Sequence, residues 1–94
     1  MTLVTTKWDA AEHLDSPEAI AAYIDAAMED GDPALISAVL GDVARAMGMS
    51  QIARESGLSR ESLYRALSQD GHPEFATVAK VMKAMGLRLA ALPL

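Results

Sequence analysis

The chain has 94 residues, a hydrophobic content of 51% and a formal net charge of −5. This length suits a single domain with a small core. The chain contains no cysteine, which excludes disulfide bonds and thiolate metal sites. No apolar run approaches the roughly 20 residues of a membrane-spanning helix, and the N-terminal segment does not resemble a signal peptide. We therefore expect a cytoplasmic domain without a membrane segment.

The net charge conceals an asymmetry between the two halves of the chain. Residues 1–44 hold nine acids and one base, for a net charge of −8, whereas residues 45–94 hold four acids and seven bases, for a net charge of +3. A basic half is an electrostatic footprint for nucleic-acid phosphates. The acidic half would repel DNA and could attract a basic partner. Alternatively, its carboxylates only decorate solvated helix faces.

Two helices are predicted in the first half of the chain. Ser16 is a suitable N-cap with Pro17 at the first helical position, and Gly31 ends this helix. Asp32 and Pro33 begin a second helix in the same way, and Gly48 ends it. Apolar residues recur at helical spacing in both segments. They are Ile20, Tyr23, Ile24, Ala27 and Met28 in the first helix, and Leu35, Ile36, Val39, Leu40, Val43 and Met47 in the second.

The segment from Met49 to Ser68 has the pattern of a helix-turn-helix. A short helix is predicted over 51–56, a turn at Gly57, and a second helix over 60–67. Glycine adopts the positive φ of such a turn at little cost. In this motif the second helix lies in the major groove of DNA, so the segment predicts a DNA-binding protein.

The remaining positions of this segment agree with the motif. Ser50 and Ser59 are predicted N-caps of the two helices, and Ala53 is small where the helices would cross. A set of apolar residues would form the underside that fixes the second helix against the first. This set contains Ile52, Leu58, Leu63 and Leu67, with Ala66 beside them.

The outer face of the second predicted helix carries the candidate reading residues. Ser59, Arg60 and Glu61 lie in its first turn, which reaches base edges in this motif. Arg60 can pair with guanine and Glu61 can accept from a cytosine amine. Tyr64 and Arg65, one turn later, can reach a further base, a thymine methyl group or a phosphate.

Other polar residues are candidate phosphate contacts, which set register and affinity without reading sequence. Ser50 and Gln51 lie at the start of the first helix of the motif, where backbone N–H groups also face a phosphate. The basic candidates are Arg45, Arg54, Lys80 and Lys83. The alternative is an ordinary helical hairpin whose arginines are solvated.

The C-terminal part is predicted to contain one more helix. Residues 69–73 are rich in turn formers, and a helix is predicted over 76–85, with Gly86 after it. Its inward residues are Val78, Val81, Met82 and Met85. Residues 87–94 could form a short strand or an ordered coil. The sequence thus predicts an all-α five-helix bundle in one domain, with an acidic arm and helix over 1–32 and a DNA-binding core and tail over 33–94.

Segments spread over nearly the whole chain carry a family resemblance. They are Trp8–Leu14, Ile20–Ile24, Glu29–Pro33, Leu40–Ala46, Met49–Arg54, Gly57–Leu67, Pro73–Phe75 and Thr77–Val78. In this order they resemble the antidote (antitoxin) proteins of addiction modules, the HigA-like group with an Xre-type helix-turn-helix. The resemblance implies a lambda-repressor-like fold and a cytoplasmic antitoxin. Such a protein would form a homodimer, neutralise a small basic toxin of the RelE/ParE-like kind and repress its own operon.

The acidic N-terminal part holds the candidate toxin contacts. These are Trp8, Glu12 and Tyr23. Trp8 has an alternative role, because the lone tryptophan of a small domain usually packs against the core. A stand-alone phage-type repressor and a protein-interaction module without DNA binding remain alternatives for the whole chain.

No residue pattern indicates a metal site, a cofactor or catalysis. His13 and His72 are far apart in sequence, with no ligand spacing around either. The methionines are typical of core filling. The acids around residues 12–18 lack a paired base or nucleophile, so we expect neither catalytic residues nor a cofactor.

Overall fold

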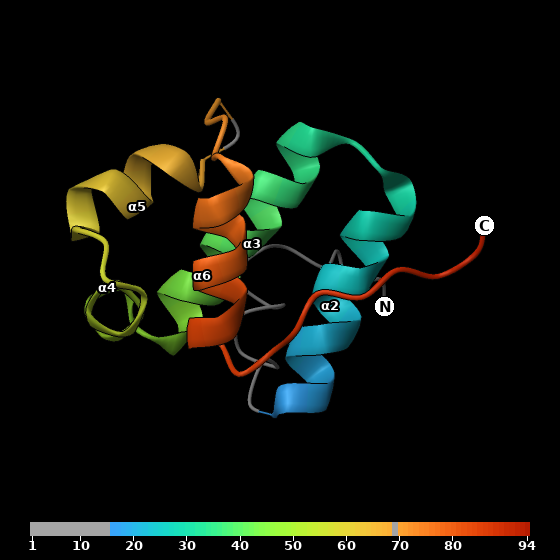
Figure 1. Cartoon of the computed structure of the whole chain (residues 1–94), viewed down its shortest axis with the longest axis horizontal. Helices are drawn as coiled ribbons and strands as arrows, with labels where there is room; N and C mark the ends of the chain where they lie inside the picture. The colour runs from blue at the N-terminus through green and yellow to red at the C-terminus, as the bar shows by residue number, and fades with distance from the viewer. Residues whose placement is uncertain (1–15, 69) are drawn as a thin grey trace, which may run out of the picture.

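The computed structural model describes residues 16–68 and 70–94, and these residues form five helices and no strand (Figure 1). The helices are α2 (Pro17–Asp30), α3 (Pro33–Met47), α4 (Met49–Ser56), α5 (Arg60–Ala66) and α6 (Phe75–Ala84). The prediction of an all-α fold is confirmed for this part of the chain. None of these helices is long and apolar enough to cross a membrane.

The first two described helices begin and end where the sequence predicts. The Ser16 hydroxyl oxygen accepts from the Ala19 N–H at 3.1 Å, and the Asp32 carboxylate accepts from the Ala34 N–H at 3.0 Å. Each bond satisfies one of the N–H groups that a helix start leaves unpaired. Gly31 ends α2 with a φ of 85°, in the left-handed region. Local capping chemistry therefore sets both starts.

The start of α4 differs from the prediction, because the helix begins at Met49 and its N-cap is Gly48 rather than Ser50. Gly48 has a φ of 110°. Its N–H donates to the Ala44 carbonyl at 2.9 Å and its carbonyl accepts from the Ile52 N–H at 3.1 Å. One residue thus ends α3 and begins α4. Ser50 lies in the first turn of α4 and is exposed, so the prediction that it caps this helix is wrong.

The core lies around α3, which packs against α2, α4 and α5, while α6 packs against α4. The largest fully buried side chains come from four helices and from the residue that follows α5. They are Leu40, Val43, Ile52, Leu63, Leu67 and Val81. The predicted apolar faces are therefore the faces that are buried. Leu35 is an exception, because it lies in the first turn of α3 and is 40% exposed.

Two adjacent residues in the middle of α3 set its contacts with the neighbouring helices. A Cβ atom at Gly41 would collide with the carbonyl oxygen of Leu67, at the end of α5. The next residue, Asp42, is 6% exposed, and its carboxylate forms one bond to α2 and one within α3. It accepts from the Tyr23 hydroxyl of α2 at 3.1 Å and from the Arg45 guanidinium at 2.8 Å. α3 is therefore held to α5 by a close approach and to α2 by a buried polar contact.

The C-terminal tail, residues 87–94, is an ordered coil that runs across α2 (Figure 1). Of the two alternatives for this segment, the strand is wrong. The Leu87 N–H donates to the Met82 carbonyl at 2.9 Å, which turns the chain away from the end of α6. Leu87 also packs against the core. The tail thereby lies beside a helix that is far from it in sequence.

Candidate nucleic-acid interface

A tight turn joins α4 and α5. Gly57 ends α4 with a φ of 78°, and nothing lies within 4 Å of the place a Cβ would occupy. The N–H groups of Gly57 and Leu58 both donate to the Ala53 carbonyl, at 3.0 and 3.1 Å. The Ser59 hydroxyl then accepts from the Ser62 N–H at 3.0 Å and begins α5. The turn glycine and the cap at Ser59 are confirmed.

The inner sides of these two helices are fully packed. Ile52 on α4 and Leu63 on α5 have no exposed surface, and Leu67 just beyond α5 is equally buried. Ala53 is 6% exposed, and Leu58 packs partly buried against the same core. Because well-packed interiors resist deformation, this arrangement fixes the direction of α5. The apolar underside predicted from the sequence is confirmed.

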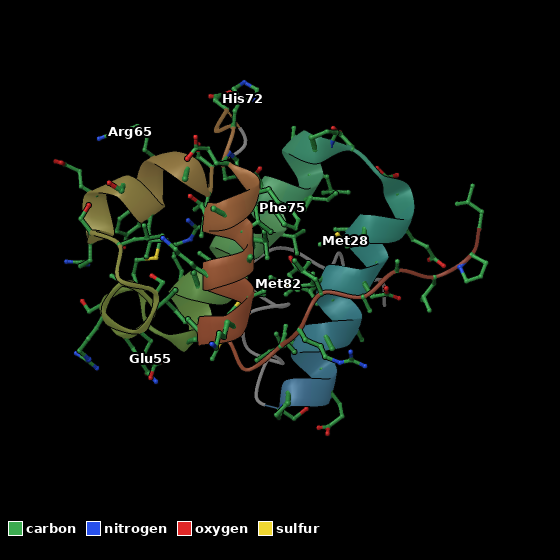
Figure 2. The ribbon with its side chains drawn as sticks, viewed as in Figure 1. Met28, Glu55, Arg65, His72, Phe75 and Met82 are labelled. Atoms are coloured by element: carbon green, nitrogen blue, oxygen red, sulfur yellow. The ribbon has the colours of Figure 1, made fainter. Side chains whose placement is uncertain are left out.

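The outer face of α5 is polar and exposed. Its side chains Arg60, Glu61, Tyr64 and Arg65 all lie in solvent, and Figure 2 shows Arg65 projecting from the surface. The Arg60 guanidinium lies 5.6 Å from the centre of the Tyr64 ring and donates to its hydroxyl at 3.4 Å. Such a cation–π pair contributes about 0.5–1 kcal/mol at an exposed site. Arg60 is thereby held over the middle of the helix without losing its exposed donors.

The side chains on α4 that were predicted to contact phosphate are also exposed. Ser50, Gln51 and Arg54 lie in solvent beside α5. Their common surface with α5 combines the cations Arg54, Arg60 and Arg65 with the Glu61 carboxylate and several neutral hydrogen-bonding groups. A hydrogen-bonding surface of this kind is what phosphate and base-edge contacts require.

The remaining basic candidates have different surroundings. Lys80 and Lys83 on α6 line a hollow of about 400 Å³ together with Glu55 and Ser56 of α4. Arg45 is 42% exposed but forms an ion pair with the buried Asp42. Its guanidinium is therefore already committed to a carboxylate within its own helix.

Of the candidate toxin residues, the structure describes Tyr23. Trp8 and Glu12 lie outside the described residues, as does His13. Tyr23 belongs to α2, and Figure 1 shows α2 and α5 on opposite sides of α3 and α6. Burial raises the pKa of the Tyr23 phenol, and the hydrogen bond to Asp42 and the charge of that carboxylate raise it further.

Sequence reasoning missed the buried carboxylate of Asp42 and the close approach at Gly41. The available signal was a glycine and an aspartate interrupting the apolar stripe of a helix, with Arg45 three residues after the acid. Within residues 16–68 and 70–94, no three histidine or acidic side chains are grouped so that they could hold a metal ion. His72 lies exposed in the loop before α6 (Figure 2).

Comparison with known proteins identifies the family of the chain. No solved structure matches the chain. An uncharacterized protein of Haemophilus influenzae is 52% identical over 88 residues, which cover 94% of this chain and 91% of the relative. A family model with the description "Probable addiction module antidote protein" matches residues 4–93. The chain therefore belongs to this family of addiction module antidote proteins.

Proposed function

We propose that this protein is the antitoxin of a type II toxin–antitoxin module and that it binds two partners. In this proposal, α4 and α5 form a helix-turn-helix of the Xre, lambda-repressor-like type, through which a homodimer represses its own operon. The protein also neutralises a small basic toxin of the RelE/ParE-like kind, as HigA-like antitoxins do. Membership in the antidote family supports the antitoxin role.

The observation that carries the DNA-binding role is the contrast between the two sides of α5. Leu63 on the inner side is fully buried, whereas Arg60, Glu61, Tyr64 and Arg65 on the outer side are exposed. A recognition helix needs a fixed direction and free hydrogen-bonding side chains near its N-terminus. Arg60 would pair with a guanine edge and Glu61 with a cytosine amine, while Tyr64 and Arg65 reach the next base or phosphate.

The first helix of the motif would position the protein on the duplex. Ser50, Gln51 and Arg54 are exposed beside α5 and would contact backbone phosphates. In a two-fold dimer the two copies of α5 would lie about 34 Å apart, which is one turn of DNA. Analytical ultracentrifugation with and without operator DNA tests the dimer. A monomer under both conditions at micromolar concentration would contradict it.

Binding to the DNA upstream of the gene tests the reading role of Arg60. We expect Arg60→Ala to weaken specific binding by about 1–3 kcal/mol, measured by fluorescence anisotropy at two salt concentrations. Arg88→Ala is the matched control, because it removes the same charge from an exposed residue of the C-terminal tail. Its affinity should stay close to that of the wild-type protein.

Two outcomes would contradict the DNA-binding role. If Arg60→Ala binds the operator as tightly as the wild-type protein, α5 is not the reading helix. If the wild-type protein shows neither specificity nor a steep salt dependence, it does not neutralise phosphates, and a protein-interaction module remains. A stand-alone repressor would bind the operator without binding the product of an adjacent reading frame.

A further inference from the structure

An apolar groove lies at the end of the molecule opposite to α5. It has a volume of about 490 Å³ and runs between α2 and the C-terminal tail. Ala22, Asp25 and Met28 line it from α2, and Leu89 and Leu92 line it from the tail. Figure 2 shows Met28 on α2, on the side of that helix towards α6. The volume falls within the range of about 300–1,000 Å³ that is usual for binding pockets.

The walls of this groove expose apolar surface. Leu92 is 79% exposed and Leu89 is 37% exposed. On the opposite wall, Ala21 and Ala22 are exposed and too small to fill the space. Contiguous apolar surface of this kind is costly in water and marks interaction sites on soluble proteins.

The backbone of the tail is not paired with the rest of the described chain. Residues 88–94 form no backbone–backbone hydrogen bond with any other residue that the structure describes. An extended segment with unpaired N–H and carbonyl groups can add to a strand of a partner. The groove therefore offers both apolar contacts and main-chain hydrogen bonds.

The charge around the groove distinguishes between two possible occupants. Residues 16–32 contain five acids, Glu18, Asp25, Glu29, Asp30 and Asp32, and no lysine or arginine. Of the described residues that line the groove, Asp25 is acidic and Arg88 of the tail is basic, so the acids of α2 outnumber the one base beside them. All five carboxylates are exposed. In a two-fold contact through this face, each carboxylate patch would meet its own copy. Like charges placed together disfavour such a contact, whereas a cationic surface would be attracted.

We propose that the groove between α2 and residues 87–94 docks a cationic protein. The partner inserts an apolar side chain between Met28 and Leu92, and its lysine or arginine side chains pair with Asp25 and the neighbouring carboxylates. This inference rests on the toxin-binding half of the proposed function and assigns that binding to a surface. It places the toxin at the far end of the molecule from α5.

The test uses the purified product of the reading frame adjacent to this gene as the probe, with binding measured by isothermal titration calorimetry. We expect Leu92→Ser to weaken binding at least about tenfold, because it removes an exposed apolar wall that the partner would cover. Leu94→Ser is the matched control, because Leu94 is also exposed and lies outside the groove. Its affinity should change less than about threefold.

A second pair of variants tests the charge. Asp25→Lys should weaken binding at least about tenfold and lower its salt dependence. Glu55→Lys makes the same change of charge at an exposed residue of α4, outside the groove and outside the five acids of α2, and should have a much smaller effect. Circular dichroism spectra of all four variants check that they fold, and all four substituted positions are exposed.

Nuclear magnetic resonance gives an independent readout on the unmodified chain. Chemical-shift changes on adding the probe should concentrate in residues 21–28 and 87–92. Changes concentrated in α5 would overturn the inference, as would variants that alter the oligomeric state but bind the probe normally. If Leu92→Ser and Asp25→Lys bind the probe as well as the wild-type protein does, the assignment of the binding site to the groove is wrong, while the proposed function stands. If the wild-type protein does not bind the probe, both fail.

Discussion

The two ends of the molecule are built for different kinds of contact. At one end, a glycine turn and the Ser59 cap hold α5 in a fixed direction, and its outer face carries cations and hydrogen-bonding groups. At the other end, α2 exposes carboxylates and alanines beside an open apolar groove. Fixed polar side chains suit base edges, whereas an exposed apolar surface with carboxylates beside it suits a cationic protein.

The largest loss of stability is expected from a substitution at Gly41, where α3 packs against the end of α5. Glycine inside a helix normally costs about 0.5–1 kcal/mol relative to alanine, so Gly41→Ala would stabilise α3 if there were room. Instead, the added methyl group meets the Leu67 carbonyl oxygen, and we expect a loss of up to about 3 kcal/mol. Chemical denaturation measures this loss of unfolding free energy.

The matched control for this test lies on the acidic end. Ala26 is exposed on α2, so Ala26→Val should cost no more than the helix propensity difference of about 0.7 kcal/mol. A Gly41→Ala variant that is as stable as the wild-type protein would show that α3 and α5 can move apart.

Substitutions at two turn glycines, Gly57 and Gly31, should reduce the stability of the fold by nearly equal amounts. Gly57 has a φ of 78° and Gly31 a φ of 85°, and neither has an atom within 4 Å of a Cβ position. Valine at either site should therefore cost about 2 kcal/mol, because L-residues are strained in the left-handed region. Thermal melting measures both losses.

Operator binding should separate these two variants. Gly57→Val redirects α5 and should reduce DNA affinity, whereas Gly31→Val alters the turn between α2 and α3 and should not. An unchanged melting temperature for Gly57→Val would show that the turn does not need glycine. Equal losses of DNA affinity would mean that the two ends are not independent.

The smallest effect is expected at the polar contact between α2 and α3. Tyr23→Phe removes the hydroxyl that donates to Asp42 and should cost about 1 kcal/mol, because the carboxylate keeps its bond to Arg45. The affinity for operator DNA should stay unchanged, since the contact lies away from α5. Urea denaturation at neutral pH provides the measurement.

The same contact predicts a dependence on alkaline pH. Burial raises the pKa of Tyr23 above its ordinary value of 10.0, with further contributions from the hydrogen bond and charge of Asp42. The stabilisation from the neutral phenol is complete below pH 10 and is lost as the pH rises through the folded-state pKa. Above pH 10, the wild-type protein should therefore lose stability more steeply than Tyr23→Phe. Parallel curves would contradict this prediction.

Much of the fold could be predicted from local chemistry. Ser16 with Pro17, and Asp32 with Pro33, define helix starts through bonds within three residues. The start of α4 could not be predicted in this way, because it depends on the φ of Gly48 and on the burial of Met49 in the shared core. The sequence therefore predicts a helix start where the capping bond joins residues that are close in the chain.

The same division applies to the two candidate surfaces. The exposure of Arg60 and Tyr64 follows from helical spacing, and a pair four residues apart is a usual neighbour pair on a helix. The groove is formed by α2 and the tail, which are far apart in sequence, so no spacing pattern could indicate it. The pairing of Asp42 with Tyr23 likewise depends on how two helices pack.

The shared residue Gly48 has a consequence for changes in chain length. Because its N–H belongs to the hydrogen-bond ladder of α3 and its carbonyl to that of α4, no spacer separates the two helices. Inserting one residue into the last turn of α3 would rotate the point at which the chain leaves that helix by about 100°. The direction of α4 and α5 would change with it. An insertion after Gly71, whose backbone approaches the Arg65 and Ala66 carbonyl groups, would lengthen the loop before α6 without entering a helix. Natural length variation should therefore accumulate before α6 and be absent at the α3–α4 junction.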